Sequence, residues 1–225
     1  MTADRILKWQ PSAIVFDCDG TLMDSERHWV AAREIVLHEY GTAPDAAFSE
    51  RTRGVHYTEC GRLMAEFAGV PALADTITEQ LLDQFRKLVM DDPVTKPGAV
   101  DLVRRTSAFA PLAVASNCPR DVVESGLARA GLLQYIGHVV VPDDTMRPKP
   151  APDLYAHACR TCDVPPDQAL AVEDSHCGIV AAAEAGLRVL GVGPRPADET
   201  LALTDLWVES LDDPQLTAWA DRLAS

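Results

Sequence analysis

The stretch Ala13-Ile14-Val15-Phe16-Asp17-Cys18-Asp19-Gly20-Thr21-Leu22-Met23-Asp24-Ser25 decides how the rest of the chain is interpreted. Four apolar residues end in two aspartates that stand one residue apart. The apolar run is short and lies between Pro11 and Gly20, a pattern that predicts a buried strand. Asp17 and Asp19 then follow the carboxyl end of that strand, where open α/β sheets bind their ligands. Two carboxylates this close repel each other unless a proton or a cation holds them, so the pattern indicates a site rather than an acidic loop.

The composition limits the class of protein. The 225 residues suffice for one domain, or for a domain with an insertion, and a hydrophobic content of 47% is typical of a globular protein. No apolar run approaches roughly eighteen residues, so we expect no membrane span. A net charge of -14 argues against nucleic acid or anionic lipid as a partner. Without an apolar signal region, and with scattered cysteines typical of reduced thiols, we expect a cytoplasmic protein. Its oligomeric state is not readable from the sequence.

Residues 25–94 show helical spacing and no convincing strand. A first helix is predicted to end at Gly41, a second to cover residues 58–68, and a third to follow a capping box that begins at Thr76. The segment is too long for a simple crossover between neighbouring strands. We therefore expect a helical cap domain over residues 25–94, inserted into a core formed by residues 1–24 and 95–225.

From residue 95 onward, short apolar runs alternate with helical segments. The runs cover residues 112–115, 138–141, 169–172 and 189–192, with a weaker one at 206–208. Strands that alternate with helices predict a parallel sheet covered on both faces. The expected fold is therefore a Rossmann-like α/β core with helices on both faces and an inserted all-helical cap.

Polar residues follow four of the predicted strands, and parallel strands bring their carboxyl ends to one edge of the sheet. Carboxylates suit Mg²⁺, the start of a helix suits a phosphate, and a lysine supplies a positive charge. Together such groups favour phosphoryl transfer to an aspartate. In chain order the residues are Asp17 and Asp19, Ser116 and Asn117, Lys149, and Glu173 with Asp174.

Taken singly, these residues have simpler interpretations. Ser116 and Asn117 could cap the helix that follows them, and Lys149 could be a solvated loop residue. Glu173 and Asp174 could begin a helix, where acidic side chains are common. The occurrence of all four groups at strand ends favours a common site.

In this arrangement the chain resembles the haloacid dehalogenase superfamily, and its phosphatase branch in particular. The similar segments are Asp17-Cys18-Asp19-Gly20-Thr21, Ser116-Asn117, Lys149-Pro150 and Glu173-Asp174, in that order. The resemblance covers nearly the whole chain, including a helical cap inserted after the first motif. It implies Mg²⁺ as cofactor and a small phosphorylated metabolite, such as a sugar phosphate, as substrate.

The resemblance also implies a role for each matching residue. Asp17 would attack phosphorus and form an aspartyl-phosphate, and Asp19 would act first as acid and then as base. Thr21 would orient Asp19. The metal would be bound by Asp17, Asp174 and the Asp19 carbonyl, and through water by Glu173. The phosphoryl group would be bound by Ser116, Asn117 and Lys149.

Several alternatives remain open at this stage. Dehalogenases resemble the chain in fold but lack the second acid, so Asp19 argues against that activity. β-Phosphoglucomutases are the nearest rival, yet they carry a histidine in place of Trp29 and an arginine in place of Tyr57. A non-catalytic binding or regulatory role conflicts with the complete set of site residues. Substrate specificity is expected in the cap, where the candidates are Glu26, His28, Arg53 and His56.

Overall fold

A six-stranded sheet, parallel throughout, forms the centre of the computed structural model, which describes residues 6–224. Its order is β3-β2-β1-β4-β5-β6, so the direction of winding switches between β1 and β4. The parallel sheet confirms the expected α/β class. The strands are β1 (Ala13–Phe16), β2 (Leu112–Ala115), β3 (His138–Val140), β4 (Ala169–Glu173), β5 (Arg188–Val192) and β6 (Leu206–Val208).

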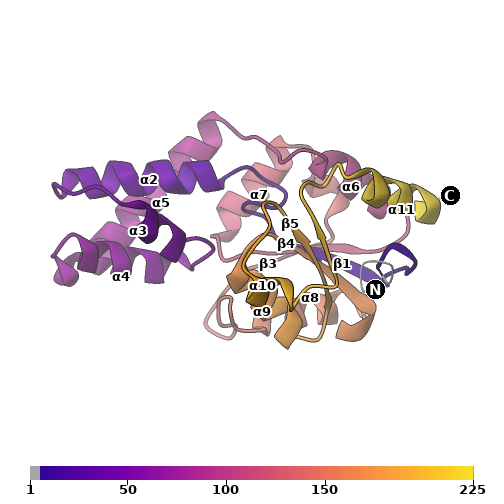
Figure 1. Cartoon of the computed structure of the whole chain (residues 1–225). Coiled ribbons are helices and arrows are strands. Elements are labelled where there is room, and N and C mark those ends of the chain that lie inside the picture. Colours follow the sequence, from indigo (N-terminus) through magenta and orange to yellow (C-terminus); the bar gives the residue numbers. More distant parts are fainter. Residues whose placement is uncertain (1–5, 225) are drawn as a thin grey trace.

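Helices cover both faces of the sheet, because successive strand residues point to opposite sides. Ile14 and Phe16 of β1 belong to the apolar layer shared with α6 (Ala99–Thr106), α7 (Arg120–Arg129) and α11 (Pro214–Ala224). Ala13 and Val15 belong to the layer shared with α8 (Asp153–Thr161) and α9 (His176–Glu184). Figure 1 shows α6 and α11 on one side of β1 and α8 and α9 on the other, with the short α10 (Asp198–Leu201) beside α9. Burial on both faces explains why the strands read as continuous apolar runs.

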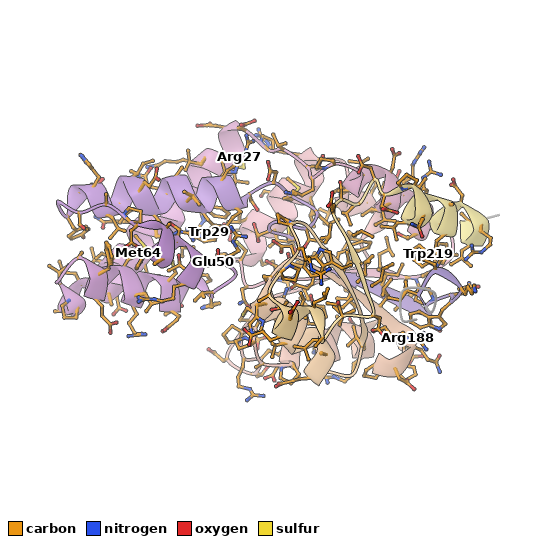
Figure 2. The ribbon with its side chains drawn as sticks, in the orientation of Figure 1. Arg27, Trp29, Glu50, Met64, Arg188 and Trp219 are labelled. Atoms are coloured by element: carbon orange, nitrogen blue, oxygen red, sulfur yellow. The ribbon has the colours of Figure 1, made fainter. Side chains whose placement is uncertain are left out.

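Four of the helices between β1 and β2 form a separate group at one end of the molecule, whereas α6 packs with the core (Figure 1). Trp29 of the first stacks on Phe85 of the last, with ring centroids 3.7 Å apart. Figure 2 shows Trp29 and the fully buried Met64 within this group, whereas Trp219 lies at the opposite end of the molecule. We call the group the α2–α5 layer; its members are α2 (Glu26–Glu39), α3 (Ala46–Arg51), α4 (Tyr57–Phe67) and α5 (Ala74–Asp91).

Two chain segments join the α2–α5 layer to the sheet, and they run side by side. Met23 forms an isolated antiparallel bridge with Thr95, and the Asp24 amide donates to the Val94 carbonyl at 2.8 Å. A rotation about this pair of segments would move the four helices together relative to the sheet.

The α2–α5 layer differs from the sequence expectation in its local detail. Helix α5 begins at Ala74, directly after a 3-10 turn, so Thr76 lies inside the helix and the expected capping box is wrong. Helix α3 was not predicted, because six residues offer too little periodicity. Gly41 ends α2 as predicted, with a φ of 74°. Within residues 6–224, no helix combines the length and apolar character needed to cross a membrane.

Candidate active site

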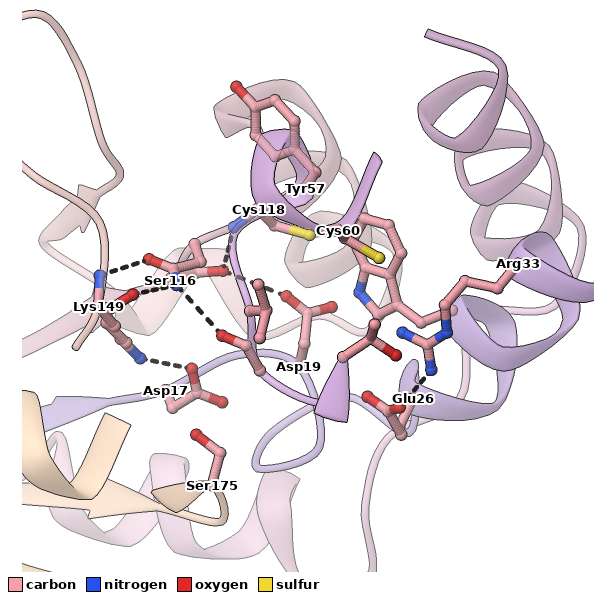
Figure 3. Close-up of a pocket in the computed structure, with 15 residues that line it drawn as sticks. Asp17, Asp19, Glu26, Arg33, Tyr57, Cys60, Ser116, Cys118, Lys149 and Ser175 are labelled. Carbon is pink, nitrogen blue, oxygen red and sulfur yellow. Dashed lines mark hydrogen bonds and ion pairs between the residues drawn. The ribbon is translucent and has the colours of Figure 1, made fainter. Parts of the chain in front are cut away.

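A small cavity lies between the carboxyl edge of the sheet and the α2–α5 layer. Its volume is about 40 Å³, which is room for only a few water molecules. Figure 3 shows Lys149 and Asp17 at one end, Asp19 near the middle, and Glu26 with Arg33 at the other end. The sheet side of the lining includes five predicted site residues, Asp17, Asp19, Ser116, Asn117 and Lys149, together with Cys118 and Ser175.

Lys149 is the positive charge at the sheet end of the cavity. It is only 4% exposed, and its Nζ donates to Asp17 Oδ1 at 2.7 Å and to Glu173 Oε1 at 2.6 Å. Burial acts to lower the pKa of Lys149, but the carboxylates of Asp17 and Glu173 outweigh burial and raise it well above its ordinary value. The ammonium therefore keeps its charge at neutral pH, where it can face an anion.

Glu173 is fully buried and fixes Lys149 in place. Its Oε1 accepts from Lys149 and from the Tyr155 hydroxyl, the latter at 3.0 Å. Its Oε2 accepts from the backbone amides of Asp174 and Ser175 and from the Ser175 hydroxyl. Both oxygens are thus engaged by the protein. Tyr155 was not identified from the sequence, because its position in α8 reads as part of an apolar helix face.

The carboxylates of Asp17, Glu173 and Asp174 fit a hard divalent cation. Each offers an oxygen within 4.8 Å of the others, and Asp17 Oδ2 is buried without a hydrogen-bond partner. Burial and repulsion from Glu173 raise the pKa of Asp174 to about 7 and that of Asp17 well above its usual value. Crowded carboxylates that resist ionisation favour a cation that neutralises them, and carboxylate oxygens are ligands that Mg²⁺ prefers.

Asp19 is held by two hydroxyl groups. Ser25 Oγ donates to Asp19 Oδ1 at 2.5 Å, and Ser116 Oγ donates to Oδ2 at 3.2 Å. Thr21, which was expected to orient Asp19, instead donates to Asp174 Oδ1 at 3.3 Å. The shorter of the two hydrogen bonds to Asp19 thus comes from Ser25, which precedes α2 and was not identified from the sequence.

The path of the loop after Asp19 depends on Gly20. This glycine has a φ of 96°, a region that favours glycine, and a Cβ at this position would overlap the Asp174 carboxylate. The backbone at Gly20 therefore passes close to Asp174, the same side chain that Thr21 contacts.

Asn117, at the end of β2, forms hydrogen bonds to the loop that carries Lys149. Its Oδ1 accepts from the Lys149 amide at 2.8 Å, while its Nδ2 donates to the carbonyls of Lys149 at 3.1 Å and of Gly54 at 3.2 Å. The side chain thereby holds the backbone on both sides of Lys149 and contacts the α2–α5 layer. A contact from Asn117 to a phosphoryl group stays a prediction.

Of the four predicted specificity residues, Glu26 alone is among the described residues that line this cavity. His28 is buried elsewhere, because two residues along a helix turn a side chain by about 200°. Arg53 is half-exposed, and its Nη2 lies 3.8 Å from Glu50 Oε2. His56 lines an adjoining cavity, which it shares with Tyr57.

Arg33 is a lining residue that the sequence interpretation missed. It stands seven residues after Glu26, a spacing of two helical turns that places both side chains on one face of α2. That spacing was the available signal. Trp29 and Tyr57 also line the cavity.

The chain belongs to the family of haloacid dehalogenase-like hydrolases, because residues 14–192 match the model of that family. The chain is 32% identical over 213 residues to validoxylamine A 7'-phosphate phosphatase from Streptomyces hygroscopicus subsp. limoneus, a match that covers 88% of this chain and 93% of the relative. It is 29% identical over 182 residues to a fructose-1-phosphate phosphatase from Escherichia coli K12, covering 80% of this chain and 96% of that protein.

Among solved structures, β-phosphoglucomutase from Clostridium difficile superposes with a TM-score of 0.81 and covers 95% of this chain and 98% of its own. At 20% identity this likeness shows the fold alone. The same fold thus occurs in a protein that is named as a mutase, so the reaction has to be argued from the site.

Proposed function

We propose that this protein is a Mg²⁺-dependent phosphatase that hydrolyses a small phosphate monoester, such as a sugar phosphate, through an aspartyl-phosphate at Asp17. The observation that carries the proposal is Asp17 Oδ2, which is buried and unpartnered beside the charged Lys149. The two relatives named above support it, because their names state phosphatase activity on phosphorylated metabolites. A cytoplasmic location and the absence of nucleic-acid partners belong to the same proposal.

In the first proposed step, a carboxylate oxygen of Asp17 attacks phosphorus. The new Asp17–phosphorus bond forms as the bond from phosphorus to the leaving oxygen breaks, and protonated Asp19 gives its proton to that oxygen. Lys149 and Ser116, which line the same cavity, bind the phosphoryl oxygens as charge shifts onto them.

In the second proposed step, Asp19 takes a proton from a water molecule as that water attacks phosphorus. The Asp17–phosphorus bond breaks, so inorganic phosphate leaves and the Asp17 carboxylate is restored. Asp19 regains the proton that it lost in the first step, and no external acid or base is required. The hydrogen bond from Ser25 keeps its carboxyl group in one position for both steps, because the single hydroxyl proton of Ser116 goes to a phosphoryl oxygen once substrate binds.

Mg²⁺ would be held by Asp17 and Asp174, with the Asp19 carbonyl and, through water, Glu173 as further proposed contacts. When bound, it would neutralise the carboxylates and so allow an anionic phosphate ester to approach them. Thr21 would support this arrangement through its hydrogen bond to Asp174.

Residues 25–94 act in this proposal as a cap that opens and closes over the core of residues 1–24 and 95–225. A cavity of about 40 Å³ is too small for a sugar phosphate, so the α2–α5 layer has to move for substrate to bind. Closure would then exclude water from a reaction whose uncatalysed rate is among the slowest known.

Phosphate release from a panel of phosphate monoesters, measured with Mg²⁺ and with a chelator, tests the proposal. We expect release that requires Mg²⁺ and that Asp17→Asn abolishes while the circular dichroism spectrum is unchanged. Formation of an isomerised sugar phosphate faster than free phosphate would support a mutase instead. No turnover of any ester with Mg²⁺ present would refute the proposed activity.

A further inference from the structure

The cavity has a second charged pair at the end opposite Lys149. Arg33 Nη2 donates to Glu26 Oε1 at 2.9 Å, and the Arg33 side chain is only 2% exposed. Figure 3 shows this pair on the far side of Asp19 from Lys149. If the phosphoryl group binds at Lys149, the leaving group extends past Asp19 toward Glu26 and Arg33.

Both members of the pair retain unused hydrogen-bonding capacity. Arg33 Nε is buried and has no hydrogen-bond partner, although an orphaned charged donor is costly to bury. Within residues 6–224, Glu26 Oε2 makes no hydrogen bond, and the Glu26 side chain keeps 25% of its surface exposed. Glu26 and Arg33 both line the cavity, so the pair offers a donor and an acceptor to a ligand bound there.

The wall beside the pair is flat and apolar. Trp29 lines the cavity, and its indole is held by stacking on Phe85 at an angle of 13° between the rings. An aromatic face next to paired charged groups suits a ligand that has apolar C–H surface together with polar groups at its edge.

The charges at this end oppose an anionic leaving group. Arg33 is already compensated by Glu26, so the pair carries no net charge, and a ligand carboxylate or second phosphate would meet the Glu26 carboxylate. Hydroxyl groups suit the pair better, because each can accept from the guanidinium or donate to the carboxylate.

Resting on the proposed phosphatase function, we infer that the Glu26–Arg33 pair binds the leaving group and selects neutral polyhydroxylated leaving groups over those that bear a carboxylate or a second phosphate. Neither residue takes part in the chemical steps. Both are specificity-determining residues, and the orphaned Arg33 Nε is the donor that the substrate hydroxyl satisfies.

A comparison of substrates tests this inference. The kcat/KM values for fructose 1-phosphate and sorbitol 6-phosphate are divided by that for 2-phosphoglycolate, in wild type and in the variants Glu26→Gln and Arg33→Lys. Both variants keep a polar side chain of similar length, and thermal unfolding checks that each one folds. Arg62→Lys is the matched control, because Arg62 pairs with Glu59 and Glu66 on the exposed face of α4, away from the cavity.

We expect wild type to prefer the sugar phosphates and each variant to lose about tenfold to a hundredfold in kcat/KM for them, the effect of removing a hydrogen bond to a charged group. Glu26→Gln should also gain activity on 2-phosphoglycolate, because it leaves Arg33 uncompensated. Arg62→Lys should match wild type. A purely structural ion pair would change the melting temperature without changing the substrate ratio, and that result would overturn the inference. Absence of turnover of every ester by wild type would instead refute the underlying phosphatase function.

Discussion

Replacing Gly178 by alanine places a methyl group against the most crowded carboxylate of the site. Gly178 lies in the first turn of α9, and a Cβ there would overlap the carboxylate of Glu173. That carboxylate is held by two backbone amides and the Ser175 hydroxyl, so it has little room to yield. We expect the methyl group to displace Glu173 from Lys149, which leaves the buried ammonium with one carboxylate partner, Asp17.

The magnitude follows from the groups that are separated. Breaking a buried ion pair costs about 3–5 kcal/mol. Alanine offsets up to about 1 kcal/mol of this cost, because glycine is the poorer helix former. The free energy of unfolding should therefore fall by about 2–4 kcal/mol. Turnover should fall by about a hundredfold, since Lys149 would no longer be held where charge develops.

Urea unfolding followed by circular dichroism and a steady-state phosphate-release assay measure the two effects. Gly126→Ala is the matched control, because Gly126 also lies inside a helix, α7, and its added Cβ would come no closer than 3.8 Å to Met23 Cε. That variant should gain about 0.5–1 kcal/mol in stability and keep its activity. If Gly178→Ala were as stable and as active as Gly126→Ala, the positioning role assigned to Glu173 would be refuted.

Three further predictions concern the acid, a histidine and the metal. Asp19→Ala should lower kcat/KM for an alkyl phosphate by about a hundredfold or more, but kcat/KM for p-nitrophenyl phosphate much less, because release of a good leaving group in the first step needs no proton; equal losses in kcat/KM would argue against the acid role. The Thr58 amide donates to His56 Nδ1, and burial lowers the pKa of His56, so the unfolded state protonates first and stability should fall as pH drops below about 6.5. Thermal unfolding across this pH range should show a smaller loss for His56→Asn. Asp174→Asn should raise the Mg²⁺ concentration for half-maximal turnover by about tenfold or more, and an unshifted Mg²⁺ titration would count against the proposed ligand.

Residues that directly follow central strands could be placed from the sequence. Asp17 and Ser116 directly follow strands buried on both faces, and Glu173 is the last residue of such a strand, so their positions alone locate them at one edge of a parallel sheet. Hydrogen-bond partners could not be predicted in the same way, because they depend on the path of the intervening loops. The turn at Gly20 sends Thr21 to Asp174, and no pattern in the sequence encodes that contact.

The sequence predicted that the α2–α5 layer is a group of helices, but it did not predict which of their residues face the cavity. Periodicity locates a helix and its apolar stripe, whereas the residues facing a cavity depend on how the helix is rotated against a different part of the chain. Glu26 and His28 are two positions apart, yet only the first lines the cavity. Arg33 reads as a solvated charge in the sequence, and its burial follows from packing of α2 against the other helices of the α2–α5 layer.

The central claim is that Asp17 becomes phosphorylated during turnover. The most direct measurement is peptide mass spectrometry of enzyme that is acid-quenched during hydrolysis of a monoester with Mg²⁺ present. The proposed mechanism predicts one added phosphoryl group on the peptide that contains Asp17, absent when a chelator replaces Mg²⁺ and absent in Asp17→Asn. Steady release of phosphate by Asp17→Asn, or a phosphoryl group found on a different residue, would contradict it.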